Sequence, residues 1–233
     1  MHFLSNPVSG QTHDLTYDDV FMVPNYTQIA SRMDVDLATD DGTGTTIPIV
    51  VANMTAIAGR RMAETVARRG GLVVIPQDIP LEIIADVIAW VKTRHIVFET
   101  PATLEATETA ASALDLITKR AHGILVVVDK TKPIGVITQS DLERVDRFTQ
   151  LRQIMHTDFT TLPDSVEPRQ AYEALEESRR EFAAIVSTSG DLVGILTKAG
   201  ALRATLYRPA LDSKNRLRVA TAIGINGDVA GKA

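Results

Sequence analysis

The sequence predicts an α/β protein in which a parallel sheet is interrupted by a repeated segment. Apolar, β-branched runs alternate with amphipathic helices over residues 47–91, an internal repeat follows, and a new strand comes after the repeat. Continuous apolar strands that alternate with helices are typical of a parallel sheet covered on both faces. Self-similarity at a fixed offset indicates two copies of one supersecondary unit.

Two strand–helix units open the predicted sheet. The run IPIVVAN, residues 47–53, is short and β-branched, and residues 60–69 then space apolar groups at helical intervals before a Gly-Gly pair. Residues 72–75 predict a second buried strand, and residues 81–91 predict a helix with one apolar face.

The middle of the chain carries the internal repeat. TLEATETAASALDLI from Thr103 matches a segment 58 positions later, and GILVVVDKTKPIGVITQSDL from Gly123 matches a segment 59 positions later. Each copy predicts a helix, a strand, a tight turn, a second strand that begins at Gly135 or Gly194, and a further helix. A turn cluster then precedes a new strand, residues 218–223, with which the α/β pattern resumes.

Composition excludes several classes of protein. A net charge of −5 and a pI near 5.5 give no general attraction to nucleic acid or to an anionic membrane. No segment approaches the roughly 20 apolar residues of a membrane span, and the N-terminus lacks a signal sequence, so we expect a cytoplasmic protein. The chain has no cysteine, which excludes disulfides and thiolate chemistry within it. His95 and His122 lack partners at ligand spacing, so no metal site is expected.

The first copy contains the motif G-V-I-T-Q-S-D at the end of a strand and the start of a helix. Such a motif suits a purine nucleotide: Gly135 lets the backbone approach, Thr138 offers a hydroxyl to phosphate, and Asp141 can accept both ribose hydroxyls. The alternative is that Thr138, Ser140 and Asp141 only cap a helix that starts at Leu142. Repetition of the motif favours the binding interpretation.

The second copy departs from this motif. Its sequence GILTKAG keeps Gly194 and Thr197, but Ala199 and Gly200 replace the serine and the aspartate, so the ribose carboxylate is missing. Together the two copies resemble a pair of CBS domains, which in that family form a Bateman module that binds adenine or guanine nucleotides. The resemblance implies a regulatory site for ATP or GTP built from Gly135, Thr138, Ser140, Asp141 and Thr197.

The flanks of the repeat carry a second resemblance. LTYDDVFMVPNY, residues 15–26, and RLRVATAIG, residues 216–224, resemble segments of the IMP dehydrogenase/GMP reductase family. That family implies a (β/α)₈ TIM barrel, here with strands at 48–53, 72–76 and 218–223 and with the tandem CBS pair inserted after the second helix. The implied domains are a first barrel part at 1–94, a CBS module at 95–208 with copies at about 95–154 and 155–208, and the start of a second barrel part at 209–233.

Active sites of such barrels lie at the carboxyl ends of the strands. This places Ala52, Asn53 and Met54 after the first strand, residues 76–77 after the second, and residues 224–226 after the third. In family members the position of Met54 packs against the purine of the bound nucleotide. The alternative for Met54 is ordinary core filling.

The A-N-M sequence resembles GMP reductases, whereas IMP dehydrogenases more often have a serine before the methionine. Thr55 stands where an aspartate is usual, and Pro76 and Gln77 stand where a histidine–lysine pair is usual. The resemblance implies a homo-oligomer, a tetramer or octamer, that reduces GMP to IMP and ammonia with NADPH. The alternative is oxidation of IMP to XMP with NAD.

Chemistry in this family uses a cysteine that attacks the purine C2, and no cysteine is present here. A complete barrel needs about 250 residues apart from insertions, and only about three of its eight strands are expected. The chain therefore reads as the N-terminal half of the enzyme, with no catalytic residue of its own. A third hypothesis is that it acts only as a nucleotide-sensing module.

Overall fold

The computed structural model describes residue 18, residues 21–226 and residues 228–233. Part of the 15–26 signature, residues 15–17 and 19–20, lies outside the described residues. The chain divides into two compact units, residues 1–36 and residues 37–233. In the first unit, the described residues include a short 3-10 helix, η2 (Arg32–Asp34), whose N-terminus is capped by the Ser31 side chain.

The second unit contains the predicted parallel sheet, and the α/β class is confirmed. Its strand order is β1-β2-β9, with Val50 opposite Leu72 and Ala220 opposite Val74. The outer strands are shorter than the sequence predicts, because regular pairing stops two residues into each of them. The strands are β1 (Val50–Val51), β2 (Leu72–Ile75) and β9 (Ala220–Thr221).

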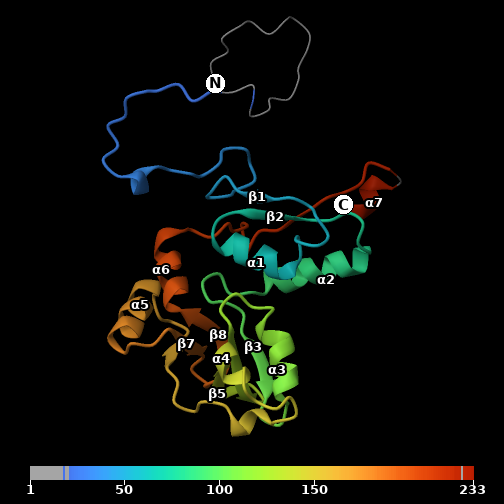
Figure 1. Ribbon diagram of the computed structural model, residues 1–233. Helices are drawn as coiled ribbons and strands as arrows, with labels where there is room; N and C mark the ends of the chain where they lie inside the picture. Colours follow the sequence, from blue (N-terminus) through green and yellow to red (C-terminus); the bar gives the residue numbers. More distant parts are fainter. Residues whose placement is uncertain (1–17, 19–20, 227) are drawn as a thin grey trace, which may run out of the picture. The chain divides into compact units, whose positions relative to one another are not determined.

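Two helices, α1 (Arg60–Arg68) and α2 (Leu81–Lys92), cover one face of this sheet (Figure 1). Their small and branched residues build the core with β2 because close approach of helix and sheet needs short side chains at the contact. Gly70 ends α1 with φ +93°, and a side chain there would collide with Thr46 and with the Arg208 carbonyl. The buried core is Ala58, Ala63, Ala67, Val73, Ile75, Ile84, Val91 and Leu217.

The two copies of the repeat fold alike. Each has a first strand parallel to a second, a helix between them, and a third strand antiparallel to the second. The first repeat consists of β3 (Ala102–Glu105), α3 (Ala110–Ile117), β4 (Ile124–Asp129), β5 (Lys132–Thr138) and α4 (Gln139–Leu142). The second repeat consists of β6 (Thr161–Pro163), α5 (Pro168–Glu177), β7 (Phe182–Val186), β8 (Leu192–Thr197) and α6 (Lys198–Leu206).

Three details of the predicted repeat are wrong. The sequence pattern omitted β3 and β6, which are short and become strands only by pairing with β4 and β7. The third strands begin at Lys132 and Leu192, so Gly135 and Gly194 lie inside them. The helix after the motif begins at Gln139 rather than Leu142, because Thr138 caps it.

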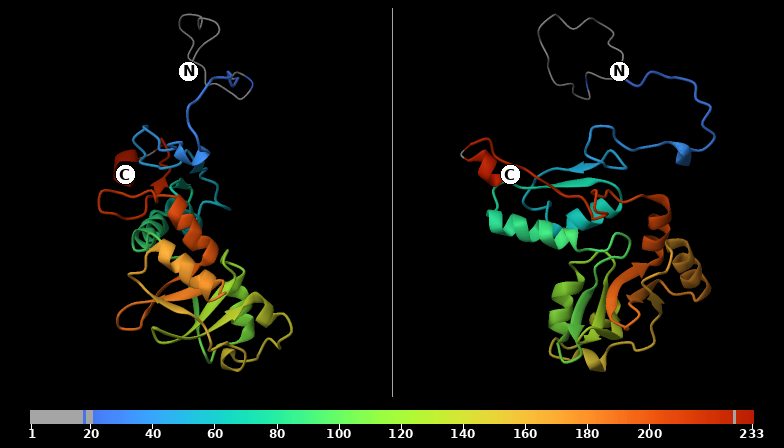
Figure 2. Two further views of the ribbon diagram at one scale, coloured as in Figure 1. Left: turned by 90° about the vertical axis from the view of Figure 1, so that its left-hand side faces the viewer. Right: turned by 180° about the vertical axis from the view of Figure 1, so that it is seen from behind.

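The sheets of the two repeats share a core, and both views in Figure 2 show them side by side. Ile124, Val126 and Val128 of β4 are packed with Ile195 of β8 in one buried cluster. The turn after β4 also bonds across the repeats, since Leu192 N–H donates to the Thr131 carbonyl at 2.8 Å. The repeats therefore form one folded pair.

Three connectors link these parts of the chain. Two of them join the repeat pair to the β1-β2-β9 sheet, and one joins the first repeat to the second. The entry connector is residues 93–101, the central connector is residues 154–160, and the return connector is residues 207–219. The return connector is fixed to α2 by Lys92, whose Nζ lies 2.9 Å from both Asp212 Oδ2 and the Leu217 carbonyl. A last short helix, α7 (Val229–Lys232), follows β9.

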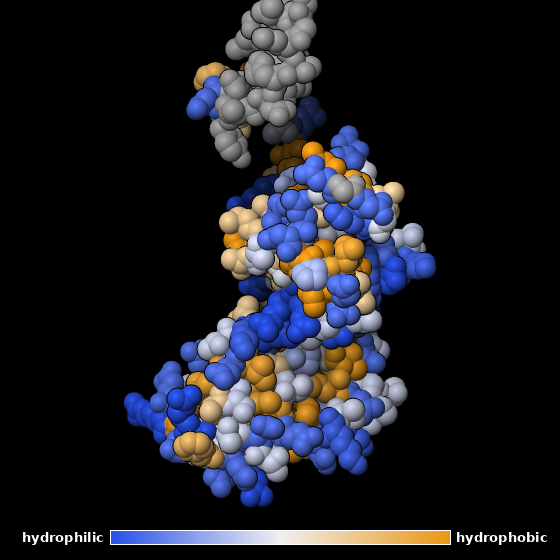
Figure 3. Space-filling view, turned by 90° about the vertical axis from the view of Figure 1, so that its right-hand side faces the viewer, coloured by the Kyte–Doolittle hydropathy of each residue, from blue (hydrophilic) through white to orange (hydrophobic). Residues whose placement is uncertain are grey.

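Apolar side chains remain on the surface of the β1-β2-β9 sheet, here called the flanking sheet, and of the segments that follow its strands. Val50, Met54, Ile57 and Leu81 are among the exposed large hydrophobic residues. Figure 3 shows hydrophobic patches on this part of the surface, separated by a hydrophilic band from those over the repeats. Over the described ranges, no helix is long and apolar enough to cross a membrane.

Candidate functional site

The structure brings together the three loops at the carboxyl edge of the flanking sheet. Thr55, after β1, donates its hydroxyl to Asp78 Oδ2, after β2, at 3.3 Å. Gln77 lies against Gly224, after β9, where an added Cβ would be 2.9 Å from Gln77 Oε1. The segments predicted to hold a substrate nucleotide therefore come from neighbouring strands and meet at one edge.

Ala52, Asn53 and Met54 are all exposed at this edge. The Met54 carbonyl accepts hydrogen bonds from the Ile57 and Ala58 amides at 2.9 and 2.8 Å, which close a turn just before α1. Met54 is 56% exposed, so within this chain it does not fill a core. Its thioether side chain is free to contact an apolar ligand surface at the strand ends.

The motif of the first repeat forms a capping box at the start of α4. Thr138 N–H donates to Asp141 Oδ2 at 2.8 Å, and the Thr138 hydroxyl lies 2.7 Å from the same oxygen. The Ser140 hydroxyl lies 2.9 Å from the Thr138 hydroxyl. The polar groups of this motif therefore bond to one another as a helix cap. This is the geometry expected if Thr138, Ser140 and Asp141 only cap the helix.

The second oxygen of Asp141 has a partner that the sequence did not reveal. His156 Nε2, from the central connector, lies 2.9 Å from Asp141 Oδ1. Although partial burial acts to raise the pKa of Asp141, the hydrogen bonds from His156 and Thr138 outweigh it and hold the pKa below its usual value. These contacts therefore favour the ionised carboxylate. No spacing pattern marks His156, because it is 15 residues away.

A pocket of about 530 Å³ lies next to this carboxylate, between the repeats. This volume suits a small organic ligand. Thr138 lines the pocket, whereas Ser140 and Asp141 do not. The other lining residues are Val136, Met155, His156, Thr157, Asp158, Phe159, Thr160, Arg180, Glu181 and Phe182.

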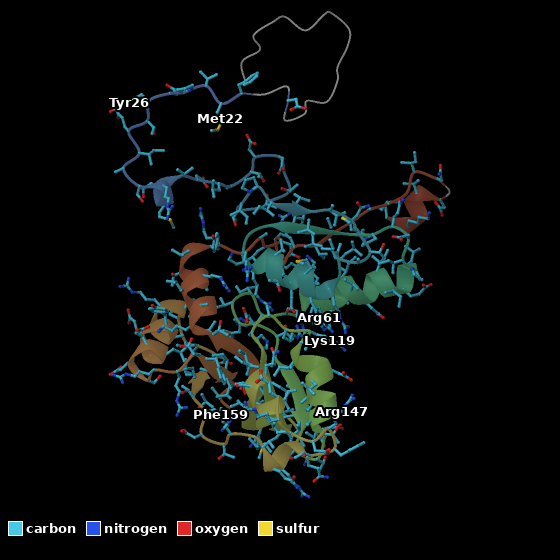
Figure 4. The ribbon with its side chains drawn as sticks, in the orientation of Figure 1. Met22, Tyr26, Arg61, Lys119, Arg147 and Phe159 are labelled. Carbon is cyan, nitrogen blue, oxygen red and sulfur yellow. The ribbon has the colours of Figure 1, made fainter. Side chains whose placement is uncertain are left out.

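The wall of this pocket supplies charge and aromatic surface. Arg180 Nη2 lies 2.6 Å from Asp158 Oδ2, and both side chains keep substantial exposure. Phe159, labelled in Figure 4, belongs to the same connector as Asp158 and faces the pocket. A guanidinium is a natural partner for phosphate, and an aromatic ring for a purine. Sequence spacing alone did not single out Arg180 or Phe159.

Gly135 has a close neighbour from the protein itself. A Cβ at Gly135 would be 2.7 Å from Met155 Sδ. Gly194 has the same relation to the entry connector, since a Cβ there would be 2.7 Å from Phe98 Cβ and 3.2 Å from the Glu99 carbonyl. Both glycines thus let a connector cross the third strand of a repeat.

Thr197 occupies in the second repeat the place that Thr138 has in the first. Its hydroxyl accepts from Gly200 N–H at 2.9 Å and caps α6. It does not line the pocket that Thr138 lines, so the structure does not bring all five predicted regulatory residues together. A smaller pocket of about 60 Å³ lies near Gly200, with Arg68, Glu99 and Arg203 in its wall.

No group of three or more His, Cys, Asp or Glu residues that could hold a metal occurs in the part of the chain that the structure describes. His95 instead uses Nδ1 to accept from the Val97 and Phe98 amides at 3.1 and 3.0 Å. Both bonds are local and hold the entry connector in its turn.

The chain is similar to known proteins over nearly its whole length. Residues 14–233 match the model of the IMP dehydrogenase / GMP reductase domain. The chain is 52% identical over 233 residues to GMP reductase of Mycobacterium tuberculosis, covering 100% of this chain and 48% of that protein. It is 32% identical over 219 residues to inosine-5'-monophosphate dehydrogenase of Nitrosopumilus maritimus, covering 92% of this chain and 46% of that protein.

Solved structures give the same result. The crystal structure of GMP reductase from Trypanosoma brucei in complex with guanosine 5'-triphosphate is 26% identical, with a TM-score of 0.63, over 96% of this chain and 56% of that one. The chain spans about half the length of the curated relatives it matches. From the family model, the sequence identities and the shared fold, this chain belongs to the IMP dehydrogenase/GMP reductase family.

Proposed function

We propose that this chain is the N-terminal part of a GMP reductase, which converts GMP to IMP and ammonia with NADPH as hydride donor. The observation that carries the proposal is the 52% identity to mycobacterial GMP reductases along all 233 residues, against 32% to the archaeal IMP dehydrogenase. The loops at the carboxyl ends of β1, β2 and β9 form one edge of its substrate site.

The proposal assigns the flanking sheet to an interrupted (β/α)₈ barrel and the repeats to a tandem CBS module. The assignment is supported by three parallel strands in order β1-β2-β9 and by helices α1 and α2 on one face. The proposed domains are residues 1–94 and 209–233 for the barrel and 95–208 for the module.

At the substrate edge, Ala52, Asn53 and Met54 would hold the purine nucleotide. The exposed Met54 offers an apolar surface to the flat face of the base, and the Asn53 amide is suited to its polar edge. NADPH supplies a hydride to the purine ring. None of the described residues is assigned to NADPH.

The regulatory ligand is proposed to be ATP or GTP, bound in the pocket between the repeats. Thr138 and Arg180 would meet phosphate and Phe159 would meet the base, and all three line this pocket. Gly135 and Ser140 would support this wall through the third strand and the capping box, and Asp141 would accept the ribose hydroxyls once His156 moves away from Oδ1. Thr197 would take part only through a second site, near Gly200.

The enzymatic proposal is tested with the full-length protein. NADPH consumption with GMP, followed at 340 nm, is compared with NAD reduction with IMP under the same conditions. We expect turnover only with GMP and NADPH. Turnover only with IMP and NAD would establish the alternative, an IMP dehydrogenase. The 32% identity to the Nitrosopumilus maritimus enzyme is the observation behind this alternative. Turnover with neither pair would leave nucleotide sensing as the function.

The regulatory proposal has its own test. Calorimetric titration of the full-length protein with ATP and with GTP should show saturable binding, and Asp141→Ala should abolish it. Asp115→Ala is the matched control, because Asp115 is an exposed aspartate of the same repeat on α3. If neither nucleotide bound, or if both variants behaved alike, the site would be wrong.

The full-length protein is proposed to be a homo-oligomer, a tetramer or octamer, as the family resemblance implies. Sedimentation of that protein with and without ATP or GTP would give the number of subunits. A monomer under both conditions would reject this part of the proposal.

A further inference from the structure

One carboxylate is buried where the flanking sheet meets the repeats. Glu64, in the middle of α1, has a side-chain exposure of 2% and partners from three separate segments. Arg68 Nη2 lies 2.8 Å from Oε2, and Arg120 Nη1 lies 2.9 Å from Oε1. The Thr100 hydroxyl donates to Oε2. The carboxylate therefore links α1, the entry connector and the first repeat.

The arginines that surround Glu64 are also largely buried. The side chains of Arg68 and Arg120 are 9% and 18% exposed. Arg68 further donates from Nε to the His95 carbonyl at 2.8 Å, which ties α1 to the entry connector. A buried carboxylate is tolerated only while its charge and hydrogen bonds are matched. Separation of Arg120 from Glu64 would leave an unmatched charge at this junction.

Helix α1 joins this junction to the proposed substrate edge. Its nine residues span about 14 Å at 1.5 Å per residue. Its first turn follows the loop that carries Met54, and its end contacts the return connector, since Ala210 N–H donates to the Ala67 carbonyl at 2.8 Å. The entry and return connectors therefore both contact the end of a short helix that begins just after the Met54 turn.

We propose that Glu64 is a positioning residue that couples the repeat pair to the substrate edge, through Arg120 on one side and α1 on the other. Thr138 of the pocket is paired with Ile124, the residue at which β4 begins after the turn that carries Arg120, so ligand binding between the repeats shifts this turn. The ion pair moves α1 with it, and α1 moves the Met54 turn. This inference rests on the proposed regulatory function, because it needs a nucleotide that acts on the repeats.

The test uses the full-length enzyme and the ratio of GMP-dependent activity with and without saturating ATP or GTP. Glu64→Gln and Arg120→Met remove one partner each, and Arg120→Lys keeps the charge but not the geometry. Arg61→Met and Lys119→Met are matched controls, since each is an exposed basic neighbour on the same element or turn (Figure 4). Nucleotide Kd is measured by calorimetry for every variant.

We expect the coupling between nucleotide and activity to fall by about 2- to 30-fold in Glu64→Gln and Arg120→Met. Basal kcat and KM for GMP and the nucleotide Kd should stay close to wild type, which a general loss of structure would not allow. The double variant should lose no more coupling than either single variant, because both remove the same link. The two controls should keep the full response.

Hydrogen exchange on the wild-type enzyme covers the case in which a variant does not fold. Nucleotide should change exchange of the amides of α1, residues 60–68. A wild type that responds to nucleotide while its variants respond equally, or while exchange of α1 is unchanged, overturns the coupling role alone. A wild type that neither binds nor responds to ATP or GTP overturns the regulatory proposal and this inference together.

Discussion

His156, which lines the candidate regulatory pocket, lies with its Nε2 2.9 Å from Oδ1 of Asp141, just outside that pocket. Asp141 belongs to the first repeat and His156 to the central connector, and the other carboxylate oxygen is held by Thr138. Both oxygens thus have partners within the protein. A ribose hydroxyl that binds Oδ1 must take the place of His156.

The first prediction follows from this competition. His156→Ala frees Oδ1, so ATP or GTP should bind the full-length protein about fivefold more tightly, equivalent to about 1 kcal/mol for one partly exposed hydrogen bond. Isothermal titration at pH 7.5 measures the change. Weaker binding by His156→Ala would show that the imidazole contacts the nucleotide directly and that the competition model is wrong.

The second prediction compares the glycines of the two third strands. Gly194→Ala places a methyl group against Phe98 Cβ and the backbone carbonyl of Glu99, and it should destabilise the protein by about 1–3 kcal/mol. Gly135→Ala meets mainly the Met155 thioether, which can turn away, so its effect should be smaller. Urea midpoints of both variants give the order, and an inverted order would contradict it.

These glycines also show how far the sequence predicts the repeat. The two copies and their buried strands follow from local apolar patterns, which is why their existence was predicted. The predicted strand starts at Gly135 and Gly194 are wrong, because both glycines lie inside the third strands. Their actual role depends on Met155 and Phe98, each from a connector outside the strand. Contacts with residues from other segments cannot be predicted from the residue pattern of a short stretch of sequence.

The residues proposed to have functional roles also fall into those that the local sequence predicts and those that it does not. Thr138 and Asp141 are close in sequence, so their motif was visible. Glu64 was not, since a glutamate on an amphipathic helix normally faces water. Its burial depends on Thr100 and Arg120, 36 and 56 residues away. Long-range electrostatics therefore set the junction around Glu64, which sequence periodicity could not predict.

The third prediction concerns pH. Burial lowers the pKa of His95, assisted by Arg68 and opposed by Asp164. Burial also lowers the pKa of His122, opposed by the charges of Glu99 and Glu64 and assisted by that of Arg120. The unfolded chain therefore binds more protons than the folded one below about pH 6.5. The free energy of unfolding should fall as the pH drops from 7 toward 5.

Asparagine variants test this assignment. His95→Asn and His122→Asn keep an acceptor near the position of Nδ1, which receives backbone amides at both sites, but they do not titrate. Urea unfolding at several pH values should show a flatter profile in the double variant. The lowered pKa values of Asp141 and Asp212 act below this window, so they do not confuse the comparison. An equally steep profile in the double variant would exclude the histidines as the cause.

The fourth prediction concerns Met54 and separates ligand contact from core packing. Met54 is 56% exposed at the carboxyl end of β1, so Met54→Ala should change stability by no more than about 0.5 kcal/mol. In the full-length enzyme it should lower kcat/KM for GMP by about 5- to 30-fold, from about 1–2 kcal/mol of lost apolar contact with the purine. Met62→Ala, a partly exposed methionine on α1, is the control and should leave kcat/KM unchanged. A stability loss of about 2–5 kcal/mol in Met54→Ala with unchanged kinetics would mean that the complete enzyme buries this side chain in its own core.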